Sequence, residues 1–128
     1  MLRILYLEDD PDDLELARLA LKRDGLHCEV HGVASREEFS RAMEGDPPDV
    51  ILSDGSVPGF DGFDALAMAR RRMPEVPFIL VSGAVTPELD QRSRRGGAVG
   101  CVPKDELARL APSIRLAVSA ARASKKSG

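Results

Sequence analysis

Short runs of apolar residues alternate with polar stretches in which apolar residues recur at helical spacing. The pattern repeats five times along the chain, and it predicts five strands that alternate with five helices. The predicted strands cover residues 2–7, 26–33, 49–54, 78–82 and 99–103. The predicted helices begin at Asp10, Ser35, Asp61, Thr86 and about Asp105, and the last one ends near Arg122.

Strict alternation of strands and helices is typical of a parallel sheet with helices on both faces. The first, third and fourth predicted strands are almost continuously apolar, as expected of strands that are covered on both sides. We therefore expect an α/β fold with one five-stranded parallel sheet. A chain of 128 residues suits a single domain, which should span residues 1–123 and leave residues 124–128 as a flexible basic tail.

Composition narrows the class of protein. The chain is 43% hydrophobic and 30% charged, which is ordinary for a soluble globular domain. Its net charge is -3, so it lacks the excess of basic residues that is typical of nucleic-acid binding. Its two cysteines are too few for a secreted disulfide scaffold. The sequence contains neither an apolar run long enough to span a membrane nor a signal-peptide pattern. We expect a cytoplasmic protein without direct contact to nucleic acid or membrane.

Polar residues stand where the predicted strands end. Glu8 and Asp9 follow the first strand, Asp54 ends the third, Ser82 ends the fourth and Lys104 follows the fifth. Ligands of open α/β sheets bind beyond the carboxyl ends of the strands, so these side chains should converge at one edge. Because packing requires none of them there, they are the candidate functional residues.

The chemistry of such a cluster is that of phosphoryl transfer. Clustered carboxylates repel one another and should raise at least one pKa unless a cation is bound, and Mg²⁺ is held by one or two carboxylates plus phosphate oxygens. Lys104 offers a point charge and Ser82 a hydrogen bond to phosphoryl oxygens. Asp54 can then act as a nucleophile that forms an acyl phosphate.

Four segments resemble the receiver domain of response regulators, the CheY-like superfamily of two-component signalling. They are LEDD at 7–10, ILSDGSVPGFDG at 51–62, LVSGA at 80–84 and VPKD at 102–105, and they match in order and spacing. The resemblance covers almost the whole chain. It implies a flavodoxin-like, doubly wound fold with strand order 2-1-3-4-5.

The resemblance also implies a phosphoacceptor switch. Asp54 would accept the phosphoryl group with the help of Lys104 and Ser82. The ligands of Mg²⁺ or Mn²⁺ would be Glu8, Asp9, Asp54 and the backbone carbonyl of Ser56. A histidine kinase or histidine phosphotransfer protein would supply the phosphoryl group, and an unidentified output protein would read the altered surface. Such a protein assists its own phosphorylation and dephosphorylation but is not expected to turn over an external substrate. The sequence does not decide between a monomer and a homodimer.

Three features depart from the family pattern. Cys101 stands where many receivers carry an aromatic residue. The resemblance implies that phosphorylation draws the hydroxyl of the fourth strand, here Ser82, inward and that the aromatic ring follows it, a step without a counterpart in this chain. Asp105 replaces the proline that commonly follows the lysine, and we expect it to cap the last helix. Residues 86–95 contain Leu89 as their only large apolar residue, which predicts a fourth helix that is short, mobile or remodelled.

Some residues favour structural roles. We expect Asp12 and Asp13 to be solvated acids in the first turn of the first helix. Cys28 and Cys101 should lie on opposite sides of the sheet, too far apart for a disulfide.

Two other functions compete with the phosphoacceptor switch. The first is a phosphorylation-independent interaction module, which Cys101 and the unusual fourth helix favour but the intact acid cluster opposes. The second is a hydrolase with an aspartyl nucleophile, since Asp10-Pro11-Asp12 resembles a two-aspartate phosphatase motif. A helix is predicted to start at that motif, however, and no cap domain is evident.

Overall fold

The computed structural model describes the backbone of residues 1–127 and the side chains of residues 1–124. The strands are β1 (Leu2–Leu7), β2 (Cys28–Val33), β3 (Val50–Asp54), β4 (Ser56–Val57), β5 (Phe60–Asp61), β6 (Phe78–Ser82) and β7 (Gly100–Pro103). The helices are α1 (Pro11–Arg23), α2 (Arg36–Ala42), α3 (Gly62–Arg72), α4 (Pro87–Arg95) and α5 (Leu110–Ser127), the last preceded by a 3-10 turn at Leu107–Arg109.

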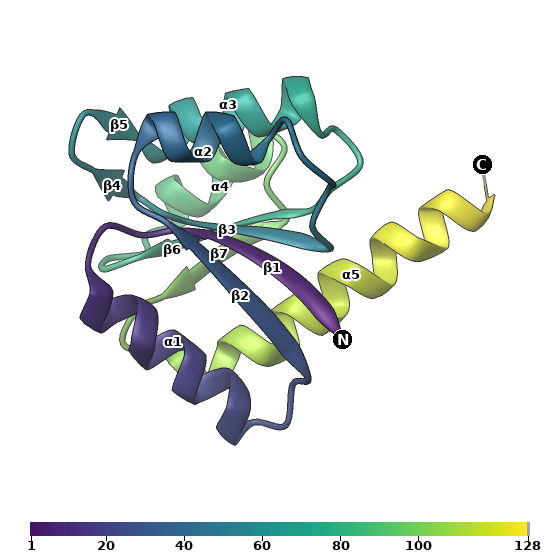
Figure 1. Ribbon diagram of the computed structural model, residues 1–128, viewed down its shortest axis with the longest axis horizontal. Helices are drawn as coiled ribbons and strands as arrows, with labels where there is room; N and C mark the ends of the chain where they lie inside the picture. The colour runs from purple at the N-terminus through teal and green to yellow at the C-terminus, as the bar shows by residue number, and fades with distance from the viewer. Residues whose placement is uncertain (128) are drawn as a thin grey trace.

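Five parallel strands form one sheet in the order β2-β1-β3-β6-β7. This order confirms the predicted 2-1-3-4-5, because β6 and β7 are the fourth and fifth strands of that sheet. Helices α1 and α5 cover one face, and α2, α3 and α4 cover the other (Figure 1). Cys28 and Cys101 lie on the two opposite edge strands, and both are free.

The sheet separates two apolar cores. Alternate residues of a strand point to opposite faces, so Ile4 and Tyr6 of β1 pack with α1 and α5, whereas Leu5 and Leu7 pack with α2 and α3. The central strands are therefore buried on both sides. This burial explains their continuous apolar runs and leaves the strand ends as the places where polar side chains can gather.

Capping side chains fix where four helices begin. The side chains of Asp10, Ser35, Asp61 and Thr86 each accept a hydrogen bond from a backbone N–H in the first turn of the following helix. These contacts satisfy donors that the helix itself leaves free. They confirm the predicted starts of α1 to α4 and set the loops beside the carboxyl edge of the sheet.

A small hairpin follows Asp54 where the sequence predicts only a loop. Strands β4 and β5 pair in antiparallel fashion, and Pro58 and Gly59 form the turn between them. Gly59 has a φ of 73°, a backbone conformation that glycine adopts without strain. Two-residue strands carry too little periodicity to be recognised from sequence.

The last helix begins later than predicted. The residue before the 3-10 turn is Glu106, and it makes no side-chain cap, so the prediction that Asp105 caps this helix is wrong. The N–H of Lys104 donates to the carbonyl of Ser82 at 2.8 Å, and the N–H of Glu106 donates to the carbonyl of Pro103 at 3.0 Å. The chain therefore extends its sheet pairing to Lys104 and turns tightly before a helix can form.

The end of that helix also differs from the expected position. Helix α5 continues to Ser127, beyond the predicted end at Arg122. The flexible tail at residues 124–128 stays a prediction, and Gly128 lies outside the described residues. No helix in the part of the chain that the structure describes is long and apolar enough to cross a membrane.

Helix α4 is short, as its weak apolar pattern predicts. Leu89 packs against the core, and Ser93 is buried. The guanidinium of Arg92 lies 3.9 Å from the ring centroid of Phe63 on α3. This cation–π contact supplements the single large apolar residue in docking the helix. The mobility of α4 stays a prediction.

We predict that Gly62→Ala destabilises the fold. A Cβ at Gly62 would lie 3.0 Å from the Cα of Gly55 and 3.1 Å from the backbone oxygen of Asp54, both parts of the backbone. The free energy of unfolding should fall by roughly 1–3 kcal/mol in chemical denaturation. At Gly45 the nearest atom would be 3.7 Å away, so Gly45→Ala is the matched control. Equal losses in the two variants would contradict the close approach.

Candidate functional site

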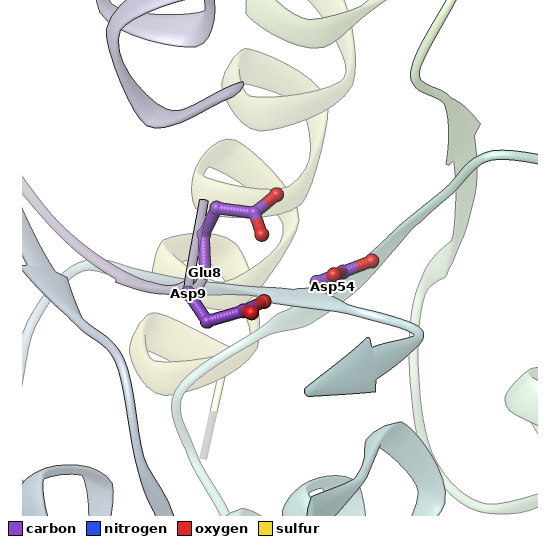
Figure 2. Close-up of side chains that lie close together, drawn as sticks. All are labelled: Glu8, Asp9 and Asp54. Carbon is purple, nitrogen blue, oxygen red and sulfur yellow. The ribbon is translucent and has the colours of Figure 1, made fainter. Parts of the chain in front are cut away.

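The five candidate residues come from four neighbouring strands. Glu8 and Asp9 directly follow β1, Asp54 is the last residue of β3, Ser82 is the last of β6 and Lys104 follows β7. Figure 2 shows the carboxylates of Glu8 and Asp9 directed toward Asp54. One oxygen atom from each of these three acids lies within 4.8 Å of the others. The sheet therefore brings together acids that are up to 46 positions apart.

The three carboxylates differ in exposure. Glu8 is 3% exposed and Asp54 is 9% exposed, whereas Asp9 is exposed. Burial raises the pKa of Glu8 above its ordinary value, and the charge of Asp54 raises it further. Lys104 and the N–H of Asp10 act in the opposite direction. The rise expected for a crowded acid is thus found at Glu8, with burial as its largest cause.

Lys104 lies at the centre of the acids. Its Nζ is 2.7 Å from Oε1 of Glu8, 2.9 Å from Oδ2 of Asp13 and 3.3 Å from Oδ1 of Asp54. Burial lowers the pKa of Lys104, but these contacts outweigh burial, and the net shift is upward. The ammonium group therefore stays charged throughout the physiological range.

Asp13 differs from the solvated acid that the sequence predicts. Its side chain is 35% exposed and accepts a hydrogen bond from Lys104. The physical reason is that α1 starts directly from the carboxyl edge of the sheet, so an acid in its first turn lies beside the site. The start of a helix so close to Asp9 was the available signal. Asp12 is exposed, as predicted.

Ser82 lies beside Gly55, the residue that follows Asp54. A Cβ built on Gly55 would be 3.5 Å from the Ser82 hydroxyl oxygen. That hydroxyl makes only long contacts, 3.3 Å to the carbonyl and 3.4 Å to the N–H of Ala84. Ser56 begins β4 at the same edge and is exposed. The roles of Ser82 and of the Ser56 carbonyl stay predictions.

The acidic cluster fits a hard divalent cation. Its donors are all oxygen atoms, the type that Mg²⁺ binds. Four carboxylates, counting Asp13, face the single ammonium of Lys104, so negative charge is left uncompensated. Apart from its ion pair with Lys104, the buried Oε1 of Glu8 has no hydrogen-bond donor among the described residues. Unbalanced charge and a poorly satisfied buried oxygen are what a bound cation would correct.

Residues 4–115 match the family model described as the response regulator receiver domain. The chain belongs to this family. Its sheet order and the acids at the carboxyl edge agree with the resemblance in the sequence. It is therefore a receiver domain of the kind found in two-component signalling.

Curated relatives are longer proteins. The C4-dicarboxylate transport transcriptional regulatory protein DctD of Pseudomonas aeruginosa is 31% identical over 102 residues, which are 80% of this chain and 22% of that protein. The response regulator GacA of Pseudomonas viridiflava is 29% identical over an alignment of 128 positions, gaps included, which covers 95% of this chain and 58% of that protein. The chain thus spans between about a fifth and three fifths of the length of these relatives.

Solved structures show the same fold. A receiver domain protein from Clostridium thermocellum has a TM-score of 0.83 at 24% identity and covers 95% of this chain and 98% of its own. The receiver domain of the sensor histidine kinase PA1611 from Pseudomonas aeruginosa has a TM-score of 0.78 at 23% identity, covering 92% and 98% respectively. That structure contains a magnesium ion coordinated in its active-site cleft. At these identities the likeness establishes the fold.

The raised pKa of Glu8 predicts a pH-dependent stability. Between the ordinary glutamate pKa of 4.5 and the higher folded value, the folded receiver domain binds more protons than the unfolded chain. The free energy of unfolding should therefore fall as pH rises through this range. Glu8→Gln removes this titration. The free energy of unfolding of this variant should therefore exceed that of the wild type by about 1 kcal/mol at neutral pH, and by little at a pH below the ordinary glutamate pKa.

Denaturation curves at several pH values, in EDTA so that no cation favours the ionised acid, measure this difference. Asp12→Asn is the control, because Asp12 is an exposed acid of the same edge. A Glu8→Gln variant less stable than the wild type at neutral pH would show that the ion pair with Lys104 outweighs the burial of Glu8.

Proposed function

We propose that this receiver domain is a phosphoacceptor switch whose Asp54 takes a phosphoryl group while Mg²⁺ or Mn²⁺ is bound. Glu8, Asp9, Asp54 and the backbone carbonyl of Ser56 are the proposed ligands of the cation. The observation that carries the proposal is the convergence of three carboxylates within 4.8 Å beside an ammonium group 3.3 Å from Asp54. A histidine kinase or histidine phosphotransfer protein is the proposed phosphodonor.

The proposed chemistry uses the arrangement of these side chains. A carboxylate oxygen of Asp54 attacks the phosphorus of a phosphohistidine; the new O–P bond forms as the P–N bond breaks, and the histidine leaves with the electron pair of that bond. The ammonium of Lys104 is already close enough to pair with an oxygen of the transferred group. The Ser82 hydroxyl, held only by long contacts, is available to donate to another oxygen. A bound cation would offset the charge of the phosphoryl oxygens.

The receiver domain is proposed to act only on its own aspartate and to turn over no external substrate. A change of surface would be read by an output protein or by an output domain of a longer chain, since the curated relatives are longer. One of them, DctD, is a transcriptional regulatory protein by name. We place any nucleic-acid contact outside these residues, the protein in the cytoplasm, and keep a homodimer as one form of output.

One observation supports the alternative of a phosphorylation-independent interaction module. Cys101 is 9% exposed, and its sulfur lies 3.2 Å from the hydroxyl of Ser93 on α4. A small side chain held in this way cannot act as the aromatic group of other receivers does. The alternative requires that the acid cluster bind neither cation nor phosphoryl group.

Beryllofluoride, which mimics the acyl phosphate, tests the proposal directly. With Mg²⁺ present, wild-type protein should show saturable amide NMR shifts around Asp54, Ser82 and Lys104, and Asp54→Asn should abolish them. Tyr6 is the only tyrosine, and the chain has no tryptophan. Because Tyr6 lines a small cavity with Lys104, its fluorescence gives a second readout of the same titration.

Asp64→Asn is the matched control for this experiment, since Asp64 is an exposed acid in the first turn of α3. This variant should behave as the wild type. Absence of a response in wild-type protein, or an undiminished response in Asp54→Asn, would favour the interaction module.

Asp9→Asn should weaken binding of Mg²⁺ alone by on the order of tenfold, or about 1.4 kcal/mol. Asp9 is exposed and forms no ion pair with any described cationic side chain, so the change leaves the contacts of Lys104 intact. Titration followed by NMR or Tyr6 fluorescence gives the affinity, with Asp12→Asn as the control for loss of a nearby charge. Equal affinities in these two variants would argue against Asp9 as a ligand.

A further inference from the structure

The ammonium of Lys104 is shared among three carboxylates. A lysine offers three N–H groups, and three carboxylates lie within 3.3 Å of its Nζ. Two of them, Glu8 and Asp54, belong to the acid triad that is suited to a cation. The third, Asp13, comes from the first turn of α1 and stands outside that triad.

The contact between Lys104 and Asp13 is a specific one. Its length is 2.9 Å, and it joins residues 91 positions apart in the chain. The two side chains are 24% and 35% exposed, so solvent screens the pair only in part. Tyr6, Leu16 and Leu107 line a small cavity together with the pair.

A phosphoryl group on Asp54 would compete for this ammonium. Its oxygens carry more negative charge than the carboxylate they replace, and the Lys104–Asp54 contact is the longest of the three. A cation bound beside Glu8 would reduce the pull of that acid on Lys104. Asp13 lies outside the proposed ligand set, so its attraction would persist.

We propose that Asp13 is a positioning residue that holds the Lys104 ammonium in the resting site and opposes the phosphorylated state. This inference rests on the function proposed for Asp54. In the resting site the Lys104 ammonium, which would stabilise the phosphoryl group, is paired with Asp13 of α1. This pairing shifts the equilibrium toward the unphosphorylated state. Removal of the Asp13 charge should release Lys104 toward Asp54 and favour the phosphorylated form.

The test measures beryllofluoride affinity in saturating Mg²⁺ for wild type, Asp13→Asn, Asp13→Glu and Asp12→Asn. Asp13→Asn should bind beryllofluoride more tightly, by roughly two- to fivefold. Asp13→Glu keeps the charge and should return the affinity toward the wild-type value. Asp12→Asn removes an equal charge one residue away on an exposed side chain, and it should leave the affinity close to wild type.

A second readout separates positioning from a purely structural role. In ¹⁹F NMR of the bound beryllofluoride, the fluorine that contacts Lys104 should shift in Asp13→Asn but not in Asp12→Asn. A gain of affinity cannot arise from misfolding, and thermal unfolding of each variant checks that the fold is intact.

The outcomes distinguish this inference from the proposed function. If wild-type protein binds beryllofluoride through Asp54, but Asp13→Asn binds with equal or lower affinity than Asp12→Asn, Asp13 does not oppose the phosphorylated state. If wild-type protein does not bind beryllofluoride, or binds without need of Asp54, the proposed function fails and the role of Asp13 fails with it.

Discussion

The ion pairs of Lys104 are the interaction on which the carboxyl edge of the sheet depends. Glu8 and Asp54 are both nearly buried, and burial of an unpaired carboxylate is costly. One ammonium lies within ion-pair distance of both and of Asp13. The backbone of that lysine is fixed in turn, because its N–H donates to the carbonyl of Ser82. The pairing of β7 with β6 thus positions the Lys104 ammonium, whose positive charge allows the acids that end β1 and β3 to lie close together.

The rest of the fold makes that approach possible. β3 lies between β1 and β6, so Asp54 sits in the middle of the sheet with apolar cores on both faces. Polar side chains can collect only where the strands end, and the short β4–β5 hairpin continues directly from there. Gly62 allows the start of α3 to contact the backbone of Gly55, which brings the helix close behind the central aspartate.

Local patterns were sufficient to predict most of this architecture. The strands of the large sheet, four helix caps and the candidates Glu8, Asp9, Asp54, Ser82 and Lys104 follow from apolar periodicity, capping residues and the rule for the ends of parallel strands. Features that depend on contacts between distant residues could not be predicted in this way. Asp13 reads as a solvated acid until the fold places Lys104 beside it. The late start of α5 has a similar origin, since Lys104 is still paired with β6.

The unusual residue at position 101 changes how the site can be connected to the surface. Cys101 contacts Ser93 of α4 through a single polar contact, and it carries no ring that could follow the Ser82 hydroxyl. A second set of contacts joins the loop after Asp54 to helix α4 without passing through β7. Gly55 lies against Gly62, which begins α3; Phe63 follows, and its ring holds Arg92 of α4. Leu89 is the only large apolar residue on α4, so the Phe63–Arg92 contact supplements the packing of Leu89 and of the buried Ser93. Helix α4 packs mainly against β7, the strand that carries Cys101. The Phe63–Arg92 contact therefore adds a second connection, from α4 through α3 to the loop after Asp54.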